Sequence, residues 1–211
     1  MKKIIAIAVA VLALGTSMSA QRYGGYNSYD RYSHRHSYDA PQTLNHVHMA
    51  YSPLTAKLYN KGSKATFPMT GISIGCGQIL PITMSLPLLL EYGIDAQYSF
   101  MMKKNENRNM MTFNAPVSIM YQVGMPGSGF AILPYAGLDF GYNLFGSQKV
   151  LGERVGYFSD LDFSRFMVGG HLGVKFLVSS VYFGLSYQGC INELASDLKY
   201  TQGQFSVGIL F

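Results

Sequence analysis

The chain has 211 residues, which is enough for one domain with a substantial hydrophobic core. Hydrophobic residues make up 48% of it but charged residues only 13%, about half the share of a usual soluble domain, so the composition favours a secreted all-β protein or a membrane barrel. The formal net charge of +5 falls to about +3 if Lys2 and Lys3 are removed, and so small an excess does not indicate nucleic-acid binding.

Residues 1–20 have the features of a secretory signal peptide. Lys2 and Lys3 precede an apolar run at 4–15, and the small residues of 16–20 suit cleavage. The run is too short for a comfortable membrane-spanning helix. We therefore expect this segment to be removed during export.

Residues 21–44 contain many Tyr, Ser, Gly and Arg residues and almost no aliphatic ones. Such a segment cannot bury a core, so we expect a flexible leader, with contact to a periplasmic partner as the alternative.

Two His-x-His pairs, at His34/His36 and His46/His48, raise the question of a metal site. On a strand, positions i and i+2 share a face, so both histidines of a pair could contact one ion. A closed site needs further ligands, and the spacing fixes none. We therefore expect no bound metal. We also expect no cofactor and no catalytic residues.

From about Asn45 the sequence alternates between apolar and polar residues, with no 3.6-residue period. Several of the alternating stretches exceed the five or six residues of soluble strands and match the roughly 9–11 residues that a tilted strand needs to cross a bilayer. There are eight such stretches: 46–52, 70–79, 88–100, 111–123, 131–145, 165–176, 181–189 and 204–211.

The breaks between these stretches alternate in length. An even-stranded barrel that begins in the periplasm predicts this order, with long loops outside and tight turns inside. We therefore predict an all-β fold, an eight-stranded antiparallel up-and-down transmembrane β-barrel over residues 45–211. The long or charged breaks are 55–69, 102–109, 146–163 and 191–201, and the short ones are 81–86, 124–129 and 177–180.

One face of each stretch carries large apolar residues, and the other carries Gly, Ser and a few charges. A soluble barrel would need many charges outside, whereas small residues suit the crowded interior of a narrow barrel, so the apolar face should contact lipid. The lumen would then hold Glu91, Asp95, Asp139, Arg165, His171 and Lys175. Because buried charges must be paired, we expect an ion-paired plug rather than a proton path or an enzyme site.

Cys76 falls near the periplasmic end of its predicted strand, whereas Cys190 falls just past the outer end of another strand. The two cysteines should therefore lie far apart. A disulfide requires Cα atoms within about 7 Å, so we expect two separate thiols.

Several segments resemble the outer-membrane β-barrel domain family of Bacteroidota, whose small barrels are similar in shape to that of outer-membrane protein A. These segments are AYSP (50–53), GISIGCG (71–77), SLPLLLEYGIDAQYSF (85–100), NAPVSIMYQV (114–123), LPYAGLDFGYNLFG (133–146) and the aromatic Phe211. The resemblance implies an eight-stranded barrel that the barrel-assembly machinery inserts into the outer membrane. It implies no defined substrate.

The expected function is that of a non-enzymatic integral outer-membrane protein, structural or engaged in binding or adhesion through surface loops, chiefly 54–69 and 147–163. The alternative is a narrow conduit or an outer-membrane lipid-modifying enzyme. The expected partners are outer-membrane lipid, the barrel-assembly machinery and an extracellular partner at the loops, with no nucleic acid.

The last stretch generates a prediction about assembly. Phe205, Val207, Ile209 and Phe211 share one face, and the resemblance implies that such a pattern is the signal read by the assembly machinery. We expect removal of Phe211 to lower the level of the protein in outer-membrane fractions, while Phe211→Tyr, which keeps the aromatic ring, has little effect. Immunoblots of fractionated cells measure this, and normal outer-membrane levels of the truncated chain would contradict it.

Overall fold

The computed structural model describes residues 43–60, 63–83, 86–103, 106–124, 129–150, 152–161, 163–195 and 198–211. The predicted signal peptide (1–20) lies outside the described residues, and so does the predicted leader (21–44) apart from Thr43 and Leu44. Nothing in the described part tests either prediction.

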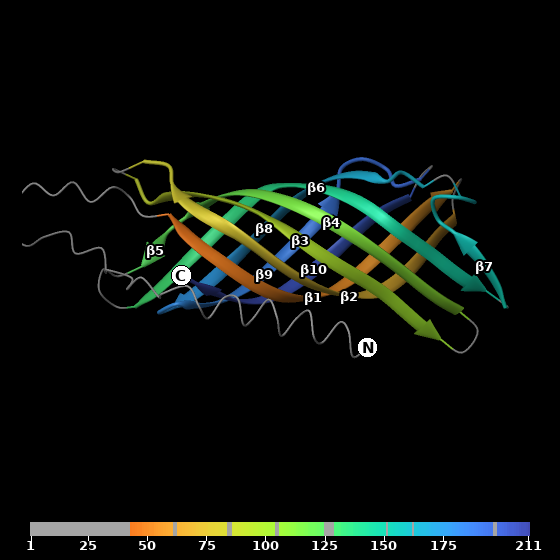
Figure 1. The fold of residues 1–211 in the computed structure, drawn as a ribbon. Coiled ribbons are helices and arrows are strands. Elements are labelled where there is room, and N and C mark those ends of the chain that lie inside the picture. Colours follow the sequence, from red (N-terminus) through yellow and green to blue (C-terminus); the bar gives the residue numbers. More distant parts are fainter. Residues whose placement is uncertain are drawn as a thin grey trace, which may run out of the picture.

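Eight long strands form a closed antiparallel barrel (Figure 1). Each long strand pairs with the next along the chain, and the first pairs with the last, so the predicted up-and-down barrel is confirmed. The long strands are β1 (Leu44–Asn60), β2 (Ser63–Pro81), β3 (Leu88–Lys103), β4 (Glu106–Tyr121), β6 (Phe130–Val150), β8 (Phe166–Val178), β9 (Val181–Cys190) and β10 (Leu198–Leu210). Two short strands, β5 (Val123–Gly124) and β7 (Glu153–Gly156), pair with β6. Among the described residues, no helix has the length and apolar character needed to cross a membrane.

The two ends of the barrel differ, as the alternating break lengths predicted. The short turn between β8 and β9 lies beside the C-terminal end of β10, where the Leu210 N–H donates to the Ser180 carbonyl at 2.7 Å. At the opposite end β7 folds back along β6 (Figure 1). We call the end with the short turns the lower end and the end with β7 the upper end.

The strands are longer at the upper end than the sequence predicted. Residues 55–60, 63–69, 102–103 and 106–109 are not loops, because β1 and β2 stay paired up to Asn60 and Ser63, and β3 and β4 up to Lys103 and Glu106. For most positions the alternation continues there in the reverse sense, with apolar residues such as Leu54 and Met69 inward and polar residues such as Thr55 outward. Arg108, which is buried, and Met102, which is 74% exposed, are exceptions. The many polar residues of the outward face made these segments look like loops.

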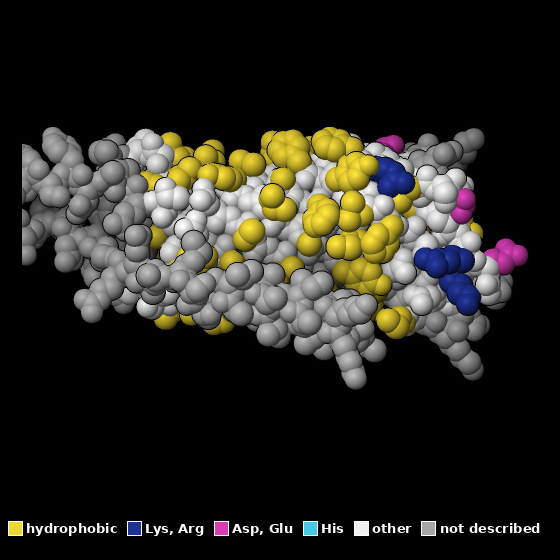
Figure 2. Space-filling view, viewed as in Figure 1, with side chains coloured by type: hydrophobic (Ala, Val, Ile, Leu, Met, Phe, Trp, Pro, Cys, Tyr) yellow, Lys and Arg dark blue, Asp and Glu magenta, His cyan; other side chains and the backbone are white. Residues whose placement is uncertain are grey.

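The outer surface is apolar along most of the barrel, and charged side chains gather near its upper end (Figure 2). Ile94 and Leu172 are 62% and 63% exposed in the middle of their strands. Such a surface suits lipid and not water. Of the proposed assembly signal, Phe205, Val207 and Ile209 face outward, while Phe211 is half-buried, and its backbone exchanges two hydrogen bonds of 2.9 Å with Asn45.

The interior has three layers along the barrel axis. A lower apolar cluster comprises Ile79, Met120, Ala131, Leu133, Leu177, Tyr182 and Leu210. An upper apolar cluster comprises Leu54, Met69, Met101, Met110, Tyr157, Met167, Leu194, Leu198 and Tyr200. Between them along the strands lies a layer of charged and amide side chains, which we call the polar layer.

Candidate functional site

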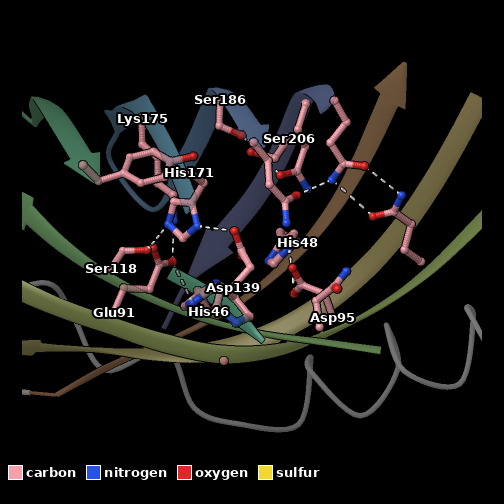
Figure 3. Close-up of a pocket in the computed structure, with 18 of the residues that line it drawn as sticks. His46, His48, Glu91, Asp95, Ser118, Asp139, His171, Lys175, Ser186 and Ser206 are labelled. Atoms are coloured by element: carbon pink, nitrogen blue, oxygen red, sulfur yellow. Dashed lines mark hydrogen bonds and ion pairs between the residues drawn. The ribbon is translucent and has the colours of Figure 1, made fainter. Parts of the chain in front are cut away.

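The polar layer is built from acid–base pairs that join different strands (Figure 3). Each of its three carboxylates has a histidine beside it. His46 Nε2 lies 3.1 Å from Glu91 Oε1, and His48 Nε2 lies 3.2 Å from Asp95 Oδ1. His171 Nδ1 lies 2.6 Å from Asp139 Oδ2. The layer therefore links β1 to β3 and β8 to β6.

The lysine of the layer lies beside the same carboxylate as His46. Lys175 forms an ion pair with Glu91, and these two residues are 6% and 5% exposed. The ammonium nitrogen also lies 5.2 Å and 4.9 Å from the ring centroids of Tyr135 and Tyr182. The Tyr182 hydroxyl hydrogen-bonds to His46 Nδ1 at 3.2 Å. The cation is thus held by one carboxylate and two aromatic rings, which compensates for its removal from water.

Five of the six residues assigned to the lumen from the sequence lie together in this layer, and Arg165 does not. The five are Glu91, Asp95, Asp139, His171 and Lys175. Arg165 is exposed at the upper end, where its Nη1 donates to the Leu144 carbonyl at 2.9 Å and its guanidinium lies 4.8 Å from the Phe158 ring centroid. It precedes the first residue of β8, so the alternation of that strand does not determine its direction.

His46 and His48 belong to the layer, although the sequence analysis considered them only as a metal-binding pair. The alternation of β1 places them on one face with Ala50 and Ser52, and that pattern was sufficient to find them. Without them, and with Arg165 outside the layer, the three acids of the lumen would have only His171 and Lys175 as bases. With them, each carboxylate has its own basic partner.

Glycines provide the space that these charged side chains occupy. A Cβ atom on Gly75 would lie 1.8 Å from Asp95 Oδ1, and one on Gly77 would lie 2.6 Å from His46 Nε2. The many glycines on the inward face are therefore explained by the crowding of the polar layer.

Ser118, His171 and Asp139 form a hydrogen-bonded chain that the sequence analysis did not find. Ser118 Oγ lies 2.7 Å from His171 Nε2, whose Nδ1 faces Asp139. Because an ionised carboxylate only accepts, Nδ1–H donates to Asp139, and in the neutral ring Nε2 accepts from the Ser118 hydroxyl. This is the order of groups in a serine hydrolase triad.

The pairing of three strands creates this chain. Ser118 of β4 and His171 of β8 are both paired with Gly137 of β6, so the three residues form one row across the sheet. Because Gly137 has no side chain, the two flanking side chains meet above it. The sequence separation of 53 residues gives no sign of this contact, and the strand register would have been needed to predict it.

Three glutamines separate this chain from the upper apolar cluster. Gln97 Nε2 donates to Gln202 Oε1 at 3.0 Å, and Gln202 donates in turn to Gln188. The cavity left within the polar layer is about 50 Å³, which admits a few water molecules and no larger substrate. Chemically, the layer can hold and exchange protons but has no room for an acyl or sugar group.

The remaining sequence-based predictions concern metals and thiols. In the described part of the chain, no three His, Cys, Asp or Glu side chains converge as a metal site requires. The absence of bound metal stays a prediction. Cys76 and Cys190 are both free, as expected.

Comparison with known proteins identifies the fold. No family model matches the sequence, and neither does any curated protein. The structure is similar to that of Ail, the attachment invasion locus protein of Yersinia pestis, with a TM-score of 0.53, 9% identity and coverage of 81% of this chain and 99% of Ail. It is also similar to Neisserial surface protein A, with a TM-score of 0.50, 16% identity and coverage of 79% of this chain and 97% of that one. At these identities the likeness shows the fold alone, a closed eight-stranded barrel of the kind found in small outer-membrane proteins.

The Glu91–Lys175 pair generates a prediction about stability. Glu91→Leu leaves the Lys175 cation buried without its carboxylate, so we expect the free energy of unfolding to fall by about 3–5 kcal/mol. The double variant Glu91→Leu/Lys175→Met should recover much of that loss. Urea unfolding of the barrel refolded in lipid vesicles measures both values.

Arg165→Met is the matched control, because it removes an exposed cation at the cost of at most about 1 kcal/mol. Lys175→Met alone leaves the buried Glu91 carboxylate without its cation, so its loss should clearly exceed that of Arg165→Met. Equal losses for these two variants would contradict the assignment of Lys175 to a buried ion pair.

Proposed function

We propose that the protein is an integral outer-membrane barrel that acts as a closed scaffold and binds a partner from outside at its upper end. The observation that carries this proposal is an interior that the polar layer closes at its middle, beneath an apolar outer surface. Apolar clusters occupy both ends of the lumen and ion pairs occupy its middle. Such a barrel can be anchored in lipid but offers no water-filled path.

The upper end is the part suited to binding. Paired strands extend there, with β7 folded back along β6. Rigid hairpins lose less conformational entropy on binding than long loops do, so the extended strands favour recognition by a preformed surface. Ail, an attachment invasion locus protein, has a barrel of the same fold. Adhesion is accordingly one form of binding that we include in the proposal.

The proposed partners follow from the proposed location. Lipid would contact the apolar outer surface, and the barrel-assembly machinery would insert the chain by its final strand. The segments that resemble the Bacteroidota outer-membrane barrel family support the same location. Nucleic acid is not among the proposed partners.

The topology can be tested with single cysteines in a Cys76→Ser/Cys190→Ser background. We expect Glu153→Cys, in β7, to react with a membrane-impermeant maleimide on intact cells, and Val123→Cys, at the lower end, to react only after lysis. In planar bilayers, we expect the purified protein to give no large, stable single-channel current, because the ion pairs of the polar layer close its lumen. Equal labelling of both positions on intact cells would contradict the proposed orientation. A large, stable single-channel current would contradict the proposal of a closed scaffold.

A second function, hydrolysis, is favoured by the chain of Ser118, His171 and Asp139. Two observations weigh against it: Ser118 is 2% exposed, and the adjoining cavity is about 50 Å³. We therefore propose that this hydrogen-bonded chain of three side chains has a structural role. A fluorophosphonate probe should then leave the folded protein unlabelled. Labelling that Ser118→Ala abolishes and Ser186→Ala preserves would establish the enzyme instead.

A further inference from the structure

The upper apolar cluster surrounds a cavity of about 220 Å³. Protein interiors are usually packed with few voids larger than a water molecule, so a hollow of this size is unusual for a structural core. An engineered apolar cavity of about 150 Å³ stays dry and binds benzene. The cavity is thus large enough for an apolar ligand. Its lining includes Leu54, Met69, Met110, Leu198 and Tyr200.

Aromatic side chains from the segment after β7 line the upper part of this cavity. Tyr157 and Phe163 stack with ring centroids 5.0 Å apart, and both line the cavity. Tyr157 packs against Gly146, where a Cβ atom would lie 2.5 Å from its ring. Burial raises the pKa of the Tyr157 hydroxyl above its ordinary value, as expected for apolar surroundings.

Methionines contribute much of the surrounding surface. Met69, Met101, Met110 and Met167 all belong to the upper apolar cluster, and Met69 and Met110 line the cavity itself. Because methionine is unbranched and polarisable, it adapts to ligands of differing shape.

Among the described residues that line this apolar cavity, one is charged. Arg108 is 8% exposed, and its guanidinium carbon lies 4.5 Å from the Phe67 ring centroid. One terminal nitrogen pairs with Glu106, but Nε has no hydrogen-bond partner among the residues that the structure describes. A buried donor on a cation is costly when unpaired and is best satisfied by an anionic oxygen.

We propose that this cavity binds a fatty acid of about eight to ten carbons, with its chain among the methionines and its carboxylate accepting a hydrogen bond from Arg108 Nε. The size of the cavity limits the length of the acyl chain, and the unpaired N–H donor of Arg108 selects a carboxylate head group. The inference deepens the proposed binding at the upper end by naming a ligand class. It stands separately from the outer-membrane location, because binding is measured on the purified barrel.

Photolabelling tests the proposal. The barrel in phospholipid nanodiscs is irradiated with a diazirine-bearing decanoic acid, and the labelled peptides are mapped by mass spectrometry. We expect labels on Met69 and Met110 that excess decanoate removes, whereas labels on the outward residues Ile94 and Leu172 come from the bilayer and persist. Methyl decanoate, which lacks the carboxylate, should compete roughly tenfold less well or worse.

Variants of two kinds test the contacts of the acyl chain and those of the carboxylate separately. Ala56→Phe fills part of the cavity and should abolish the competed label, with Ala195→Phe as a second filling variant. Arg108→Met should weaken competition by decanoate roughly tenfold or more and make it equal to that by methyl decanoate. Arg154→Met is the matched control for a cation at the same end of the barrel and should change nothing.

Each variant is first shown to be folded by its heat-modifiable migration on gels. Labels confined to outward residues, or interior labels that decanoate does not remove, would overturn the proposal. So would equal competition by decanoate and methyl decanoate in the unchanged protein, because the head group would then have no partner in the site.

Discussion

In the proposed membrane setting, lipid contacts only part of each strand, and the rest of the structure depends on this constraint. Where the outward face meets lipid it must be apolar, so the polar residues of the same strands point inward. Beyond that band the outward face meets water, and the inward face becomes apolar again. In β1 the inward face changes from His46 and His48 to Leu54 within a few residues. One barrel therefore contains both an ion-paired core and an apolar core.

The polar layer shows how a narrow barrel accommodates charged side chains in its interior. Each acid has a basic partner on another strand, and the glycines next to the ion pairs leave room for their side chains. A channel would need this space for water, whereas here the side chains occupy it. The apolar outer surface and the closed lumen are thus two results of the same packing.

The sequence predicted the parts of the fold that depend on local alternation. Eight strands, their apolar outward faces and five of the six lumen residues follow from a period of two. Arg165 was misassigned because it lies just outside its strand. Residues 55–60 and 63–69 were misassigned because the alternation reverses near the upper end. The contact between Ser118 and His171 could not be predicted, because it depends on the register of both strands with β6.

The row formed by Ser118, Gly137 and His171 has a consequence for how the sheet is aligned. Shifting β8 along β6 by one residue would turn His171 and Lys175 toward lipid, and a shift by two would move both away from Asp139 and Glu91. The apolar outer surface alone tolerates a shift of two, since apolar residues recur at most of the alternate positions of β6 and β8. The buried ion pairs therefore determine the register of β8 against β6, which the outward apolar side chains alone would not fix.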